Sequence, residues 1–219
     1  MKIRTLLVIA FLFCTIIGYA QNPPFWNDVQ KFKKQDSTSF PAKKQILFIG
    51  SSSFTMWKDA EQYFPGYKIL NRAFGGSQLS NQIHYVKDVV YPYNPKQIII
   101  YCGENDFTSS PNVTADTVLH RFQTLFNLIR SKYKKTPIAF VSIKPSPSRW
   151  HLKDKMIEAN SLIQQFLATK KRTDFIEVYS KMLNQQGLPQ GNIFLKDSLH
   201  MNAQGYAIWQ KAMAPYLKK

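Results

Sequence analysis

Short apolar runs rich in β-branched and aromatic residues alternate along this chain with segments of helical periodicity. Ile98, Ile99 and Ile100 are apolar at consecutive positions, which predicts a strand covered by helices on both faces. Five runs predict strands: Gln45–Gly50, Tyr67–Phe74, Gln97–Gly103, Pro137–Lys144 and Phe175–Tyr179. Because helical segments separate these runs, we expect one α/β domain built on a parallel sheet of about five strands.

Apolar stripes predict the clearest helices. One stripe runs from Val118 to Ile129 behind Thr114, an expected N-cap, a second from Leu152 to Phe166, and a last helix lies within Asn202–Leu217. In a right-handed parallel α/β fold, the loops that leave the carboxyl ends of the strands gather at one rim. We therefore expect the chemistry at that rim.

The chain is strongly basic. It carries 29 Lys and Arg against 13 Asp and Glu, a formal charge of +16. The basic residues are scattered and are not interleaved with aromatics, as a binder of single-stranded nucleic acid would require. We therefore predict a solvated basic surface and no nucleic-acid partner.

The N-terminal 20 residues predict a signal peptide, because Lys2 and Arg4 precede the apolar run Leu6–Ile17 and small residues follow it. About a dozen apolar residues fall short of the roughly twenty that span a membrane, so we expect export to the periplasm or cell exterior without stable membrane insertion. An uncleaved anchor is the alternative. Residues 21–44 predict an irregular lead-in segment that packs a few aromatics on the domain, which would comprise 45–219.

A serine cluster follows the first predicted strand. Gly50-Ser51-Ser52-Ser53 delivers hydroxyl groups at the carboxyl end of a buried strand, where a helix is about to begin. Taken alone, such a segment is equally a turn or a helix cap. A serine acts as a nucleophile only when a base removes its proton and a third group orients that base.

His200 is the candidate base. His84, His120 and His151 fall within or beside predicted helices, whereas His200 lies in a loop, three residues after Asp197. That spacing allows the carboxylate to hold the imidazole while its other nitrogen faces a serine. A capping aspartate beside an incidental histidine is the alternative.

Two further strand ends supply groups that can stabilise an oxyanion. The second predicted strand runs into Phe74-Gly75-Gly76-Ser77, where glycines allow backbone N–H groups to approach a substrate. The third runs into Gly103-Glu104-Asn105-Asp106, which brings an amide donor to the same rim. With the serine cluster and the Asp-His loop, these segments predict a site for acyl transfer.

In their order and context, the four segments resemble the blocks of SGNH hydrolases, also called GDSL-like esterases and lipases. The resemblance implies a flavodoxin-like three-layer α/β/α sandwich and a serine ester hydrolase that needs no metal or organic cofactor. It implies Ser52 as nucleophile, with Asp197 and His200 completing the triad. The backbone N–H groups of Ser52 and Gly76 and the Asn105 side chain would form the oxyanion hole.

One residue departs from the family pattern. Ser51 stands where the family usually has Asp, which puts the orientation of the loop in question. Ser51 and Ser53 are the alternative nucleophiles if the alignment slips within the serine run.

The substrate is predicted only by class. We expect an acetyl ester of a carbohydrate or other small molecule first and a lipid acyl ester or thioester second. A non-catalytic protein that binds glycan or membrane surfaces is the rival. Arg149 and Trp150 follow the fourth predicted strand, where Arg149 could meet an anionic group and Trp150 could stack on a sugar ring. A proline-stiffened loop with a half-buried Trp is the alternative.

Overall fold

The computed structural model describes residues 22–219, so the predicted signal peptide lies outside the described residues. Its centre is a single parallel sheet of five strands in the order β2-β1-β3-β4-β5. The strands are β1 (Ile46–Gly50), β2 (Ile69–Asn71), β3 (Gln97–Tyr101), β4 (Ile138–Val141) and β5 (Thr173–Ile176). The predicted parallel sheet is confirmed. Most strands end before the predicted runs do, because the polar and glycine residues at their carboxyl ends belong to loops.

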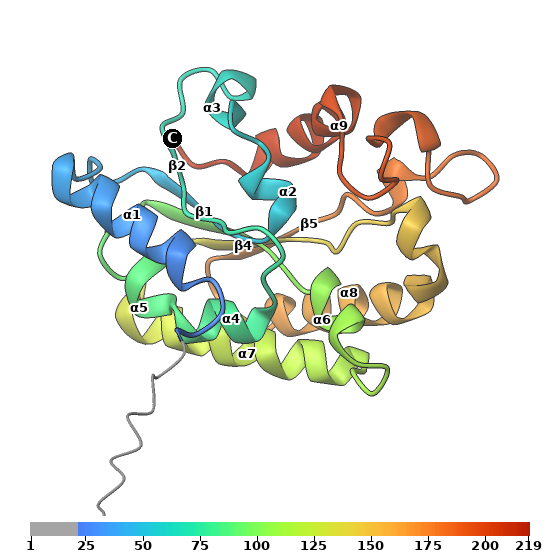
Figure 1. Cartoon of the computed structure of the whole chain (residues 1–219), viewed down its shortest axis with the longest axis horizontal. Helices are drawn as coiled ribbons and strands as arrows, with labels where there is room; N and C mark the ends of the chain where they lie inside the picture. The colour runs from blue at the N-terminus through green and yellow to red at the C-terminus, as the bar shows by residue number, and fades with distance from the viewer. Residues whose placement is uncertain (1–21) are drawn as a thin grey trace, which may run out of the picture.

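Helices cover both faces of the sheet and make three layers, which confirms the predicted α/β/α sandwich (Figure 1). The α-helices are α1 (Trp26–Thr38), α2 (Ser52–Thr55), α3 (Ala60–Tyr63), α4 (Leu79–His84), α5 (Val86–Val89), α6 (Glu104–Ser109), α7 (Ala115–Lys132), α8 (Lys153–Ala168) and α9 (Ala203–Met213). Short 3₁₀ helices are η1 (Pro147–Leu152), η2 (Ser180–Met182), η3 (Gly191–Ile193) and η4 (Ala214–Tyr216). Within residues 22–219, none of the helices combines the length and hydropathy needed to cross a bilayer.

Alternate residues of the central strands enter opposite cores. Ile98 and Ile100 pack with the layer formed by α4, α5, α7 and α8. Ile99 and Tyr101 pack on the other face with Trp209 of α9. Every residue of β1 and β3 is buried, so these two strands form a fixed base for the loops at their carboxyl ends.

The helices predicted from apolar stripes are present. Thr114 caps α7 by accepting a 3.2 Å hydrogen bond from the Thr117 N–H, and the buried residues of α7 form the predicted stripe. The second stripe lies on α8 and the last on α9, which starts one residue later than predicted behind the Asn202 cap.

The sequence analysis predicted an irregular lead-in segment, and this prediction is wrong because the segment contains helix α1. Val29 is its one buried residue, so the helix has almost no apolar stripe by which to recognise it. Polar contacts hold it instead, because Asp36 forms an ion pair with Arg72 and accepts a 2.6 Å hydrogen bond from the Tyr93 hydroxyl. Just before the helix, the Phe25 ring packs 5.3 Å from the Phe74 ring, centroid to centroid. The N-terminal segment thereby reaches the glycine block.

Candidate active site

Ser52 is the first residue of α2 and follows the carboxyl end of β1 after one linking residue, Ser51. Gly50 makes this sharp connection with a φ of +131°, and a Cβ on it would lie 1.8 Å from the Tyr101 carbonyl oxygen. Only glycine fits so close to the neighbouring strand. The Ser51 N–H donates a 2.9 Å hydrogen bond to that same carbonyl, which fixes the loop at the rim of the sheet.

Ser52, His200 and Asp197 form one continuous chain of hydrogen bonds. The Ser52 Oγ lies 3.0 Å from His200 Nε2, and His200 Nδ1 lies 2.6 Å from Asp197 Oδ2. The other carboxylate oxygen of Asp197 accepts 2.9 Å bonds from the backbone N–H groups of Leu199 and His200. The hydrogen bond from His200, aided by these backbone donors, lowers the pKa of the Asp197 carboxyl to about 2. The carboxylate is therefore ionised at neutral pH and can orient the imidazole.

The loop that carries His200 is fixed at both ends. Phe194 and Met201 form an antiparallel bridge, and the His200 carbonyl accepts a 2.7 Å hydrogen bond from the Leu195 N–H. Directly after the loop, the Asn202 side chain caps α9. Although His200 lies 148 residues from Ser52 in sequence, its ring therefore has a defined position.

The backbone N–H groups of Ser52 and Gly76 have no acceptor among residues 22–219. The Ser52 N–H is free because it opens a helix, where the first N–H groups have no intrahelical partner. Gly76 adopts a φ of +80° and is exposed, with the Phe25 ring alongside. Both donors remain available to a bound oxygen.

A cavity of about 380 Å³ opens over the serine. Its lining residues are Ser52, Thr55, Met56, Gly75, Gly76, Asn105, Arg149, Leu199 and His200. Apart from Asp197, which lies behind the imidazole, every residue predicted for the triad or the oxyanion hole lines this cavity, and Arg149 does too. Trp150 does not line it, and its ring instead lies 5.3 Å from the Lys153 ammonium.

Comparison with known families agrees with this arrangement. The model of the GDSL-like Lipase/Acylhydrolase family matches residues 50–208, which spans the serine cluster, the glycine block and the His200 loop. The chain belongs to this family.

Solved structures with the same fold include a GDSL-like lipase from Bacteroides thetaiotaomicron, 18% identical, with a TM-score of 0.71 over 86% of this chain and 96% of that one. A Streptococcus pneumonia protein, provisionally described as a platelet activating factor, is 21% identical with a TM-score of 0.76 over 88% and 92% of the two chains. At such identities the likeness demonstrates the fold alone. Among curated proteins, none matches this chain.

The Asn105 side chain of this GDSL-like protein is fully engaged. Its Nδ2 donates to Ser51 Oγ at 2.7 Å and to the Ser77 carbonyl at 3.0 Å. Its Oδ1 accepts a 2.9 Å bond from Arg149 Nη1. The Ser51 hydroxyl, at the position where the family usually has Asp, thus serves as an acceptor for the amide expected in the oxyanion hole.

Behind Asn105 lies a buried ionic cluster that the sequence analysis did not predict. Glu104 accepts from Lys144 Nζ at 3.1 Å, from Arg149 Nη1 at 3.2 Å and from the Tyr101 hydroxyl at 2.7 Å. Burial raises the pKa of the Glu104 carboxyl, but the two cations outweigh it and the pKa lies below its ordinary value. The only sequence signal was an ionisable residue at the end of each of two buried strands, Glu104 after β3 and Lys144 after β4.

Proposed function

We propose that this protein is a serine ester hydrolase that works through an acyl-enzyme on Ser52. The observation that carries the proposal is the hydrogen-bonded chain from Ser52 through His200 to Asp197, with distances of 3.0 and 2.6 Å. It lies at the carboxyl edge of a parallel sheet, in a chain of an acylhydrolase family.

In the first half of the reaction, Ser52 Oγ attacks the ester carbonyl carbon and its proton passes to His200 Nε2. The carbonyl oxygen becomes an oxyanion, which the N–H groups of Ser52 and Gly76 would stabilise. Collapse of the tetrahedral intermediate breaks the bond to the alcohol oxygen, and His200 gives its proton to that leaving alcohol. In the second half, His200 takes a proton from water, which attacks the carbonyl carbon of the acyl-enzyme. Collapse of this second intermediate breaks the bond to Ser52 Oγ, which takes the proton back from His200, and releases the acid.

Asn105 would be the third oxyanion donor, but one of its two Nδ2 hydrogen bonds must first leave its present acceptor. Both protons on Nδ2 face acceptors, Ser51 Oγ and the Ser77 carbonyl. An oxyanion is a stronger acceptor than a hydroxyl group. As negative charge develops, the Nδ2 N–H that now donates to Ser51 would therefore donate its hydrogen bond to the substrate oxygen instead. The hydrogen bond would then be gained in the transition state and not in the free enzyme, which favours catalysis.

We infer that the acyl group is short and that the alcohol is polar, as in an acetylated carbohydrate. Although most of the exposed lining is apolar, Met56 and Leu199 are the only long apolar side chains among the described residues that form it, so the cavity has no extended apolar wall to hold a fatty acyl chain. Thr55 and Arg149 add polar atoms to the same lining. We also propose that the protein acts outside the cytoplasm, on the basis of the sequence pattern in its N-terminal 20 residues.

The test uses p-nitrophenyl acetate with the wild type, Ser52→Ala and Ser51→Ala, together with labelling by a fluorophosphonate and mapping of the labelled peptide. We expect hydrolysis and labelling by the wild type and by Ser51→Ala, and neither by Ser52→Ala. No hydrolysis and no label in the wild type would overturn the proposal and support a non-catalytic binding protein. A series of p-nitrophenyl esters of increasing chain length then tests the acyl group, and faster hydrolysis of long chains would replace the carbohydrate ester with a lipid.

A further inference from the structure

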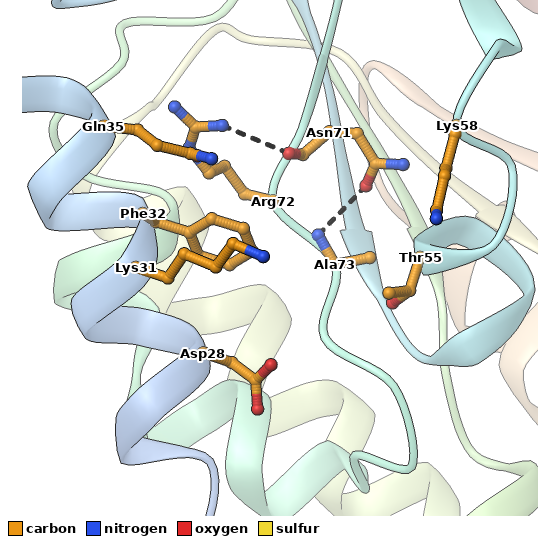
Figure 2. A pocket seen from close by; sticks show the side chains of 9 residues that line it. All are labelled: Asp28, Lys31, Phe32, Gln35, Thr55, Lys58, Asn71, Arg72 and Ala73. Carbon is orange, nitrogen blue, oxygen red and sulfur yellow. Dashed lines mark hydrogen bonds between the residues drawn. The ribbon is translucent and has the colours of Figure 1, made fainter.

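A second cavity adjoins the one over Ser52. It measures about 350 Å³ and lies between α1, the segment that follows α2 and the loop after β2 (Figure 2). Its lining residues are Asp28, Lys31, Phe32, Gln35, Thr55, Lys58, Asn71, Arg72 and Ala73. Thr55 lines both cavities and lies on the same short helix as Ser52. A ligand that extends past Thr55 would therefore occupy both.

Two lysines make this second cavity positively charged. Figure 2 shows the Lys31 side chain extending from α1 over Phe32, and the Lys58 side chain on the opposite side of the cavity with its nitrogen directed toward Thr55. Both residues are exposed, and neither has an ion-pair partner among residues 22–219. Their ammonium groups keep their donors available.

The remaining charges on the lining do not cancel the two lysines. The Arg72 guanidinium is already satisfied, because it forms an ion pair with Asp36, donates to the Tyr93 hydroxyl at 3.0 Å and donates to the Asn71 carbonyl at 3.3 Å. Asp28 is the only carboxylate among the described residues that line the cavity. Two ammonium groups against one carboxylate leave the cavity with an excess positive charge next to the catalytic serine.

We propose that the Lys31–Lys58 cavity binds an anionic group, a phosphate or a carboxylate, on the part of the ester remote from the scissile carbonyl. This inference rests on the proposed ester hydrolase function and specifies its substrate as an acidic ester. Lysine ammonium groups act as point charges that tolerate either anion, and the flexible side chains can close on a group that enters between them. The Gln35 side chain adds an amide group to the lining, whereas the Asn71 amide is already occupied, because it donates to the Phe54 carbonyl and accepts from the Ala73 N–H.

The test compares three substrates: p-nitrophenyl acetate, O-acetylated polygalacturonate for the carboxylate and an O-acetylated sugar phosphate for the phosphate. The variants are Lys31→Gln, Lys58→Gln and the double variant. Lys34→Gln, also on α1 but outside the lining, is the charge-matched control. Because each lysine is exposed, we expect kcat/KM on the preferred acidic ester to fall about threefold in each single variant and about tenfold in the double variant. Hydrolysis of p-nitrophenyl acetate and the control variant should stay unchanged.

The acidic ester whose kcat/KM falls in the lysine variants identifies the anion. An equal loss on all three substrates, or no loss on either acidic ester, would overturn the inference while leaving the esterase intact. If the wild type hydrolyses none of the esters, the proposed function fails, and a direct measurement still decides on the cavity. Calorimetric binding of de-acetylated polygalacturonate or of inorganic phosphate that is lost in the double variant would support the anion site. Binding equal to that of the wild type, or absent from both, would refute it.

Discussion

The Arg149 guanidinium donates a 2.9 Å hydrogen bond to Asn105 Oδ1, and this bond fixes which way round the Asn105 amide lies. With the oxygen held by Arg149, the nitrogen is directed toward Ser51 and Ser77. Glu104 holds Arg149 in turn, at 3.2 Å. The buried ionic cluster thus orients, through Arg149, the amide of the proposed oxyanion hole.

Removal of either member of this pair should impair turnover, but to different extents. We expect Asn105→Ala to lower kcat by on the order of 10²- to 10³-fold, because one oxyanion donor is lost. Arg149→Met should cost about tenfold, since the donor remains and only its orientation is weakened. If Arg149 acts through Asn105, the double variant should be no slower than Asn105→Ala alone. Steady-state kinetics on p-nitrophenyl acetate measure all three.

Lys153→Met is the control for these three variants, because it removes a cation from the same region and Lys153 does not line the cavity. It should retain wild-type turnover. Additive losses in the double variant would mean that Arg149 acts on the substrate independently of Asn105.

Most of the fold could be predicted because its signals are local. β1 and β3 are buried along their whole length, so their sequences are continuously apolar, and α7 buries a regular stripe behind a capping threonine. The convergence of Ser52 and His200 was also predictable, since parallel topology brings strand ends to one rim and the order of the four blocks fits a known family.

Asp197 should couple the stability of the fold to pH. The carboxyl has a folded-state pKa of about 2 against an ordinary 3.8, so its contribution to stability is present above pH 3.8 and is lost as the pH falls toward 2. The free-energy difference of unfolding between the wild type and Asp197→Asn should therefore be constant near neutral pH and shrink below 3.8. Urea unfolding at a series of pH values checks this, and a difference that persists unchanged at about pH 2 contradicts it.

The same substitution should lower kcat by about 10³- to 10⁴-fold, because an amide cannot hold the His200 ring in the required tautomer. Asp197 remains ionised well below neutral pH, so protonation of this carboxyl should not lower the activity of the wild type in mild acid. Steady-state kinetics on p-nitrophenyl acetate measure both expectations, and a wild-type kcat within about tenfold of that of Asp197→Asn would contradict the prediction.

Gly50 should be indispensable for folding. An added Cβ would lie 1.8 Å from the Tyr101 carbonyl oxygen, in addition to the backbone strain at φ +131°. We expect Gly50→Ala to lower the free energy of unfolding by more than about 3 kcal/mol. Gly66 is a matched control, because it also has a positive φ, +83°, but has open space around it. Gly66→Ala should cost about 1 kcal/mol, and equal losses in thermal or urea unfolding would exclude the close approach as the cause.

Features that depend on contacts between distant polar residues could not be predicted. Helix α1 buries only Val29 and is fixed by Asp36 on Arg72, a pairing 36 residues apart that no periodicity reveals. Trp150 was considered for sugar stacking because it follows β4, but the turn of η1 directs Arg149 to the cavity lining and leaves Trp150 beside Lys153. Neighbours in sequence can face opposite ways on such a turn, so spacing alone did not separate them.

The buried pair of Glu104 and Lys144 should show strong coupling. Lys144 is 1% exposed and Glu104 7%, so removal of one partner leaves the other charge in an environment of low dielectric. We expect Glu104→Gln and Lys144→Met each to lower the free energy of unfolding by about 3 kcal/mol, near the lower end for buried pairs because Arg149 partly compensates in the Lys144 variant. The double variant should lose clearly less free energy of unfolding than the two single variants lose together. It removes both charges, so neither is left buried without its partner. Urea denaturation of the four proteins gives the coupling energy. Lys68→Met, which breaks the exposed pair with Glu61, provides the contrast and should change the free energy of unfolding far less than either buried variant. Additive losses would mean that the two residues stabilise the rim independently, and the orientation of Asn105 through Arg149 would then not depend on Lys144.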